Sequence, residues 1–141
     1  MADSTIYFQR SAGLVLEHSF GCYAELRYLP GKRQSGDLAA LLTQLGSLLL
    51  ARDWHKFLSD NRQMAPYSAG EKQWFVSQWL TGAVPRPNPL TGVMVLPEQV
   101  VARLSFLEMS MRAAEVSLRY RTFLEMGEAL TYLNQLPGEC A

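Results

Sequence analysis

The sequence predicts one α/β domain over residues 1–141, with a single mixed β-sheet and helices packed against it. Three observations carry this prediction. The chain opens with three short β-rich runs separated by glycine turns, it changes to a helical spacing of leucines from residue 35, and it then alternates apolar runs with helical segments. The expected order is βββαβαβαβα. Strands that alternate with helices pair in parallel through right-handed crossovers, whereas the first three strands form an antiparallel meander.

The first three strands are expected at residues 6–10, 14–20 and 23–29, where alternating or β-rich runs end at glycine or Pro30-Gly31. A helix follows, because six leucines recur at spacings of three and four and share one face: Leu38, Leu41, Leu42, Leu45, Leu48 and Leu49. Either Ser35 or Asp37 is suited to cap its start. The short apolar run at residues 56–60 predicts a buried strand.

A capping box, Ser68-x-x-Glu71, marks the start of the next helix. Its inward stripe is expected to contain Trp74, Phe75 and Trp79, and its end lies near Gly82. Prolines make the following segment a loop, since each removes a backbone donor.

The second half continues with a strand at residues 92–96, closed by Pro97, and a helix that opens at Glu98. That helix carries apolar residues on one side: Val100, Val101, Leu104, Leu107, Met111 and Ala114. Residues 118–123 alternate as a strand near a sheet edge, because Arg119 and Arg121 share a face. The last helix carries Met126, Ala129, Leu130, Leu133 and Leu136 and stops at Pro137-Gly138.

Composition limits the classes of function. Thirteen basic and thirteen acidic residues cancel, and the only basic pair is Lys32-Arg33, so no patch favours nucleic acid or an anionic membrane. No run approaches the roughly 20 apolar residues of a spanning helix. The N-terminus, Met1 to Thr5, lacks the pattern of an export signal. Cys22 and Cys140 have no metal or redox spacing, which predicts reduced thiols in a cytoplasmic protein.

The most informative polar residues are Asp60, Asn61 and Arg62, at the end of the buried strand. In one interpretation they are structural: an acid or amide caps the turn, and Arg62 pairs with a carboxylate. In the other they bind a partner or ligand, because ligands of open α/β sheets lie outside the carboxyl ends of parallel strands and Arg62 offers a two-pronged donor. Tyr67 and Ser68 extend this candidate surface.

The sequence offers no catalytic set and no metal site. His18 and His55 are too few for a metal ion, which requires three or four ligands. Ser59, His55 and Asp60 lie too close along one strand to converge as a triad, and neither a nucleophile elbow nor a phosphate loop occurs. An enzyme would need a carboxylate that the fold brings next to His55 or His18. We therefore expect no enzymatic activity and no cofactor.

Aromatic and leucine-rich stripes leave two further alternatives open. Trp74 and Trp79 line a possible pocket, although such stripes are more often core. Leu50, next to Leu48 and Leu49, falls off the first helical stripe, which suggests a possible homodimer face on that helix.

The chain resembles the SpoIIAA-like, or STAS-like, domains of bacteria, which are related to the anti-sigma-factor antagonists. The resemblance rests on five short motifs in order: Ile6-Tyr7-Phe8, Asp60-Asn61-Arg62, the helix from Ser68 to Trp79 with Gln73-Trp74, the strand from Gly92 to Leu96 followed by Pro97-Glu98, and Tyr120-Arg121-Thr122-Phe123 before Glu128-Ala129-Leu130. It implies a non-catalytic domain that binds a protein or ligand. In kinase-switched antagonists a serine between a central strand and the next helix is phosphorylated, and Ser68 is the corresponding possible phosphosite. Its Ser-Ala-Gly context departs from the family motif, and a role as helix cap is sufficient to explain a serine here.

The function expected from these observations is a regulatory domain that works by contact with an unidentified protein, without nucleic acid or membrane insertion. The alternative is a binding domain for a small apolar or anionic, lipid-like molecule.

Overall fold

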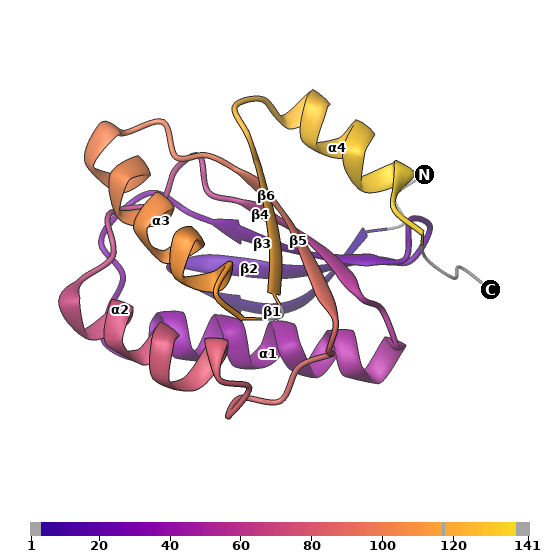
Figure 1. The fold of residues 1–141 in the computed structure, drawn as a ribbon, viewed down its shortest axis with the longest axis horizontal. Coiled ribbons are helices and arrows are strands. Elements are labelled where there is room, and N and C mark those ends of the chain that lie inside the picture. Colours follow the sequence, from indigo (N-terminus) through magenta and orange to yellow (C-terminus); the bar gives the residue numbers. More distant parts are fainter. Residues whose placement is uncertain (1–3, 117, 138–141) are drawn as a thin grey trace.

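A six-stranded mixed sheet forms the centre of the computed structural model, which describes residues 4–116 and 118–137. Met1, Ala2, Asp3, Gly138 and Cys140, which entered the sequence-based expectations, lie outside the described residues. The strands lie side by side in chain order (Figure 1): β1 (Ser4–Arg10), β2 (Gly13–His18), β3 (Tyr23–Tyr28), β4 (Lys56–Asp60), β5 (Leu90–Val95) and β6 (Leu118–Phe123).

Pairing in the sheet confirms the predicted fold class. β1, β2 and β3 pair antiparallel, and β3–β4, β4–β5 and β5–β6 pair in parallel. β1 and β6 are the two edges, so the strand that carries Arg119 and Arg121 lies at an edge as expected. The element order βββαβαβαβα is also confirmed, with helices α1 (Asp37–Arg52), α2 (Ala69–Trp74), α3 (Val100–Ala113) and α4 (Met126–Gln135).

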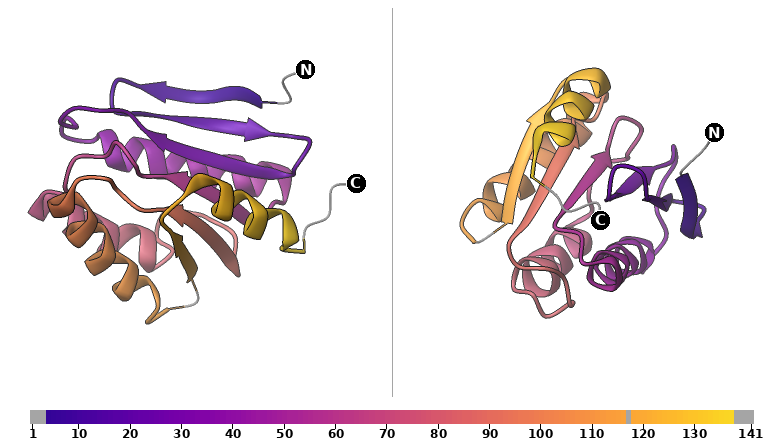
Figure 2. Two further views of the ribbon diagram at one scale, coloured as in Figure 1. Left: turned by 90° about the horizontal axis from the view of Figure 1, so that it is seen from above. Right: turned by 90° about the vertical axis from the view of Figure 1, so that its right-hand side faces the viewer.

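The helices cover the two faces of the sheet unequally. α1, α2 and α3 lie on one side and α4 on the other (Figure 2). α1 packs on β1, β2 and β3, whereas α4 packs on β4, β5 and β6. The opposite face of β1, β2 and β3 therefore has no helix over it among the described residues, and this open half of the sheet positions the candidate site.

The first helix confirms the leucine pattern. All six leucines of the predicted face are buried, while Leu50 is exposed. The helix begins at Asp37 and its N-cap is Gly36, with no side-chain cap, so the expected cap by Ser35 or Asp37 is wrong. The Asp37 carboxylate instead accepts a hydrogen bond from the amide of Gln34. Because its six other leucines are buried, α1 retains only Leu50 as an exposed leucine for the suggested dimer face.

The capping box at the start of α2 is present. The Glu71 amide donates to Ser68 Oγ at 3.1 Å, and the Ser68 amide donates to Glu71 Oε1 at 2.8 Å. The helix continues as a π-helix, η1 (Phe75–Leu80), and Arg86 donates to the carbonyls of Trp79 and Leu80 at its end. This satisfies carbonyl groups that a helix end leaves without partners.

The orientation of α3 was not evident from its apolar pattern. It begins at Val100 rather than Glu98, and the buried face consists of Ala102, Ser105, Phe106, Met109 and Ala113. Five of the six residues of the predicted apolar side are exposed to solvent: Val100, Val101, Leu104, Met111 and Ala114. The pattern located the helix, but its larger apolar stripe points away from the sheet.

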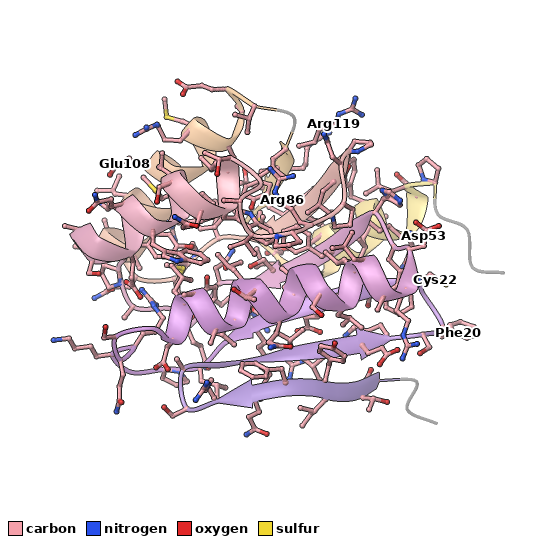
Figure 3. The ribbon with its side chains drawn as sticks, turned by 90° about the horizontal axis from the view of Figure 1, so that it is seen from below. Phe20, Cys22, Asp53, Arg86, Glu108 and Arg119 are labelled. Atoms are coloured by element: carbon pink, nitrogen blue, oxygen red, sulfur yellow. The ribbon has the colours of Figure 1, made fainter. Side chains whose placement is uncertain are left out.

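The turn between β2 and β3 corrects the expectation for the cysteines. Cys22 is disulfide-bonded, so the prediction of a reduced thiol is wrong for this residue. In Figure 3 this turn lies at the same end of the molecule as Asp53, which follows α1.

Within residues 4–116 and 118–137, none of the helices combines the length and apolar character needed to cross a membrane.

Candidate functional site

The open half of the sheet carries a row of charged side chains. Residues of one strand alternate between the two faces, so Glu25 and Arg27 of β3 share the open face with His18 of β2, which pairs with Tyr23. Asp60, at the end of β4, pairs with Arg27 across the parallel ladder. Arg27 and Asp60 lie near the carboxyl ends of β3 and β4, and the row continues through Glu25 to His18, which lies beside the first residue of β3.

A pocket of about 560 Å³ lies among these strands, the loops that follow β4 and β5, and α4. Its charged lining consists of His18, Glu25, Arg27, Asp60, Arg62 and Glu98, and we call it the open-face pocket. Leu58, Met126 and Leu130 supply an apolar wall on the side of α4. The volume falls within the range typical of small-ligand pockets.

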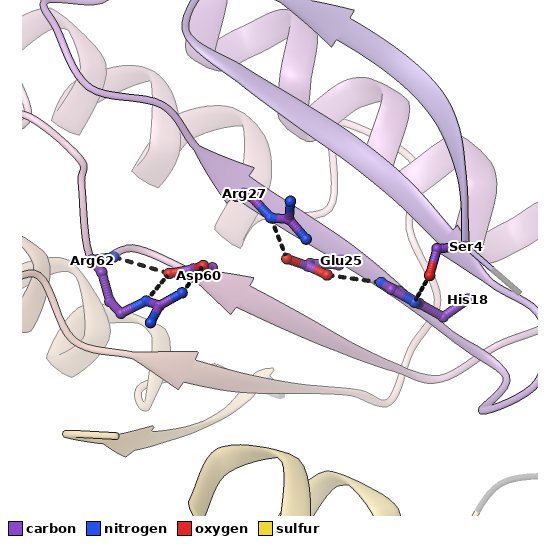
Figure 4. Close-up of polar contacts among 6 residues, drawn as sticks. All are labelled: Ser4, His18, Glu25, Arg27, Asp60 and Arg62. Atoms are coloured by element: carbon purple, nitrogen blue, oxygen red, sulfur yellow. Dashed lines mark hydrogen bonds and ion pairs between the residues drawn. The ribbon is translucent and has the colours of Figure 1, made fainter. Parts of the chain in front are cut away.

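Two acid–arginine pairs organise the open-face pocket (Figure 4). Arg27 Nε donates to Glu25 Oε2 at 2.8 Å, and Arg62 donates to Asp60 through Nε and Nη2, both at 2.9 Å. The acids are buried and the arginines are not: side-chain exposure is 5% for Glu25 against 42% for Arg27, and 8% for Asp60 against 44% for Arg62. Each buried carboxylate therefore holds a guanidinium that still presents N–H groups toward solvent.

Glu25 is the most constrained of these acids. Burial by itself raises the pKa of Glu25, but hydrogen bonds from His18 and Arg27 and the charges of both residues hold the pKa below its ordinary value of 4.5. The hydrogen bond to Asp60 likewise raises the pKa of Arg62. At neutral pH Glu25 is thus ionised and lies beside charged arginines.

Ser4, His18 and Glu25 form a chain of hydrogen bonds along the same face (Figure 4). Ser4 Oγ lies 2.8 Å from His18 Nδ1, and His18 Nε2 lies 2.7 Å from Glu25 Oε1. In the neutral Nε2–H tautomer Nε2 donates to the carboxylate and Nδ1 accepts from the serine hydroxyl, whereas in the charged imidazole both nitrogens donate. The imidazole also stacks on Tyr23, with ring centroids 4.6 Å apart. The fold thus supplies the carboxylate next to His18 that an enzymatic interpretation required.

This chain differs from a hydrolase triad in two respects. In such triads the serine bonds Nε2 and the acid bonds Nδ1, whereas here the two attachments are exchanged. Glu25 is also shared with Arg27, and Ser4 lies in an edge strand rather than at a strand-to-helix turn that presents free amides. The arrangement fixes the orientation of His18 on the pocket wall without building an oxyanion site.

Of the three predicted residues Asp60, Asn61 and Arg62, two line the pocket and one lies in the core. Asp60 and Arg62 line the open-face pocket, as the binding interpretation expected. Asn61 is fully buried: its side chain accepts a hydrogen bond from Ser59 Oγ at 2.7 Å and donates to the Ser59 carbonyl at 3.3 Å. Asn61 therefore shapes the turn after β4, and its inclusion in a solvent-facing surface is wrong.

Tyr67 and Ser68 belong to a different region, centred on Arg33. Arg33 lies between the rings of Tyr28 and Tyr67, 5.5 and 5.3 Å from their centroids, and donates to Glu71 at 2.6 and 2.9 Å. Burial raises the pKa of Tyr67 well above 10.0, so its hydroxyl stays neutral. Ser68 is exposed and caps α2, and its modification stays a prediction.

The two tryptophans of the suggested aromatic pocket do not act together. Trp79 is fully buried, and its Nε1 donates to the hydroxyl of Tyr120 at 2.8 Å. Trp74 is half-buried and lines a second pocket of about 560 Å³ beside Arg33 and Ser68. Trp79 is therefore core, and only Trp74 borders open space.

Sequence reasoning missed His18, Glu25 and Arg27 as site residues. The available signal was the pair of charged residues two positions apart within an apolar β-rich run, which places both on one face of a strand. Its meaning depends on which half of the sheet α4 covers, and local spacing does not encode that. Over the described ranges, 4–116 and 118–137, no group of three or more His, Cys, Asp or Glu residues is arranged to hold a metal ion.

Comparisons with known proteins add no relative: no family model matches this chain, and neither a curated protein nor a solved structure matches it.

Proposed function

We propose that this chain is a STAS-like, non-enzymatic regulatory domain that binds a protein partner through the open-face pocket. One observation carries the proposal: the buried carboxylates of Glu25 and Asp60 hold two half-exposed guanidinium groups that line one pocket. Arginine N–H groups fixed in this way bind a carboxylate with little further ordering. The expected partner therefore presents an acidic side chain that contacts Arg27 and Arg62.

The balance of charge in the open-face pocket favours a specific contact over general attraction to anions. The negative charges of Glu25, Asp60 and Glu98 offset the positive charges of the arginines. A partner therefore gains binding free energy only if its own charges lie opposite the matching residues. The apolar wall of Leu58, Met126 and Leu130 gives such a partner a surface to bury beside the ionic contact. The resemblance implies a bacterial protein, and the proposal includes a homodimer. The disulfide of Cys22 removes the reduced-thiol observation from which a cytoplasmic location was expected.

Affinity capture from the source cells tests this proposal. The wild-type chain is compared with Arg27→Gln/Arg62→Gln, and with the matched control Arg10→Gln/Arg119→Gln, which removes two exposed arginines outside the open-face pocket. We expect one protein to be retained by the wild type and the control and lost by the pocket variant. Equal recovery by all three, with unchanged thermal melting, contradicts the proposal.

The second candidate is a small anionic molecule with an apolar portion. The volume of the open-face pocket and its combination of arginines with an apolar wall favour it. Thermal denaturation with short- and medium-chain fatty acids tests it. A rise in melting temperature that Arg27→Gln/Arg62→Gln abolishes supports this function, whereas no rise with any of these ligands contradicts it.

A further inference from the structure

The outer face of α3 carries an apolar stripe that the rest of the described chain leaves largely exposed. Val100, Leu104 and Met111 have exposed fractions of 65%, 63% and 72%, and Leu107 between them is half-buried. The residues that pack inward are on the opposite side of the helix. Isolated exposed apolar residues are common on proteins, but a contiguous row along a whole helix marks an interaction surface.

The spacing of this stripe specifies a helical partner. The four residues Val100, Leu104, Leu107 and Met111 follow at intervals of four, three and four, which is the a/d pattern of a two-helix seam. Leu104 and Met111 take the a positions, and Val100 and Leu107 take the d positions. An irregular groove on another protein has no need of this repeat, whereas a second α3 matches it along its full length.

The flanking charges select a second copy of this chain in parallel orientation. Arg103 and Glu108 lie on opposite sides of the seam, five residues apart. Arg103 precedes an a position and is therefore at g, and Glu108 follows a d position and is at e. In a parallel pair each g residue faces the e residue five positions later on the partner, so Arg103 of each copy meets Glu108 of the other. In an antiparallel pair g residues face g residues and e residues face e residues. This arrangement sets arginine toward arginine and glutamate toward glutamate.

Existing contacts leave both side chains able to do this. Arg103 Nε donates to the Pro97 carbonyl at 3.0 Å, and Lys72 Nζ donates to Glu108 Oε1 at 2.9 Å. The Lys72–Glu108 pair is exposed, with side-chain exposures of 32% and 54%, and such pairs contribute little to stability. Glu108 can therefore bind the partner's guanidinium without leaving Lys72.

We propose that α3 forms a parallel two-helix interface between two copies of this chain. The helix has 14 residues, so it spans about 21 Å, and the seam contains two a and two d positions per copy. An interface of this size gives a reversible dimer whose population depends on concentration. The inference is independent of the open-face pocket: that pocket is lined by Met126 and Leu130 of α4, and α3 and α4 lie on opposite sides of the sheet (Figure 2).

Sedimentation equilibrium of the full chain over a range of concentrations tests the interface. We expect a monomer–dimer equilibrium, and Leu104→Glu should weaken it at least about tenfold, the change that about 1.4 kcal/mol produces. Leu104 is exposed, so this substitution leaves the fold intact, as circular dichroism should confirm. Arg112→Glu, an exposed charge change on the same helix outside the seam, is the matched control and should leave the dimer unchanged.

Charge exchange tests the orientation. Arg103→Glu alone should weaken the dimer, because it sets two acids against each other, and Arg103→Glu/Glu108→Arg should restore it. A chain that is monomeric at all concentrations, or a dimer that Leu104→Glu leaves unchanged, overturns the interface. A dimer that Arg103→Glu weakens and the double exchange does not restore overturns the parallel arrangement.

Discussion

Arg33 and Glu71 form a buried ion pair that joins the segment after β3 to the first turn of α2. Their side chains are 2% and 18% exposed, and two guanidinium nitrogens contact the two carboxylate oxygens. Glu71 also accepts from the Ser68 amide, so one carboxylate serves both the ion pair and the helix cap. This pair fixes the loop that separates β4 from α2.

Removal of Arg33 should be strongly destabilising. Arg33→Ala removes the guanidinium partner of Glu71, whose side chain is 18% exposed and keeps the Ser68 amide as a donor, so we expect a loss of about 1–3 kcal/mol. Urea unfolding followed by circular dichroism measures the change. Lys32→Ala, at the exposed neighbouring position, is the control and should stay within about 0.5 kcal/mol of the wild type. A loss below about 1 kcal/mol for Arg33→Ala shows that the pair does not tie these segments together.

Acid should destabilise the fold partly through Glu25. Its pKa is below 4.5 in the folded chain, so the folded state favours the ionised form. The resulting stability is complete above pH 4.5 and is lost as the pH falls through the folded-state pKa. Unfolding free energies measured between pH 7 and pH 3 should fall less steeply for Glu25→Gln than for the wild type below pH 4.5. Parallel curves for the two proteins argue against this role of Glu25.

Gly46 marks a close approach between α1 and the loop before β5. A β-carbon at this position would overlap the carbonyl oxygen of Pro85. Gly46→Ala therefore forces the helix and loop apart, at a cost of about 1–3 kcal/mol, even though alanine favours helices. Ser47→Ala, at the next and exposed position, carries the propensity effect without the clash. Thermal unfolding should separate the two variants, and a stabilised Gly46→Ala contradicts the packing described.

The Ser4–His18–Glu25 chain should have no hydrolytic activity. Its exchanged attachments and the shared carboxylate leave the serine without the environment of an acyl-transfer nucleophile. Incubation with a fluorophosphonate probe, followed by mass spectrometry, should give no labelling at Ser4. Labelling that His18→Ala abolishes would assign an enzymatic function instead of a binding one.

The sequence predicted the element order because the chain switches clearly between spacings of two and of three to four. The leucines of α1 show this, since their pattern located both the helix and its buried face. The same reasoning located α3 but not its buried face, because Val100, Leu104 and Met111 are larger than the alanines that pack inward. In α3, the size of an apolar side chain therefore does not predict whether that side chain is buried.

The candidate site shows a similar limit. Asp60 and Asn61 are neighbours along the chain, yet one lines the pocket and the other is wholly inside, since successive residues point to opposite faces. β3 contributes Glu25 and Arg27 to the pocket for two reasons. Arg27 pairs with Asp60, which is distant in the sequence, and α4 does not cover the face of β1, β2 and β3 on which these side chains lie. Neither feature has a local signal.

Photo-crosslinking in the source cells tests the central claim most directly. A photoreactive amino acid replaces Gln63, an exposed residue that lines the open-face pocket, or Thr43, an exposed residue of α1, as the control. The account predicts a crosslinked protein at position 63 that is absent at position 43 and lost when Arg27→Gln/Arg62→Gln is added. Crosslinks of equal yield at both positions, or a product at position 63 that survives loss of the two arginines, would contradict it.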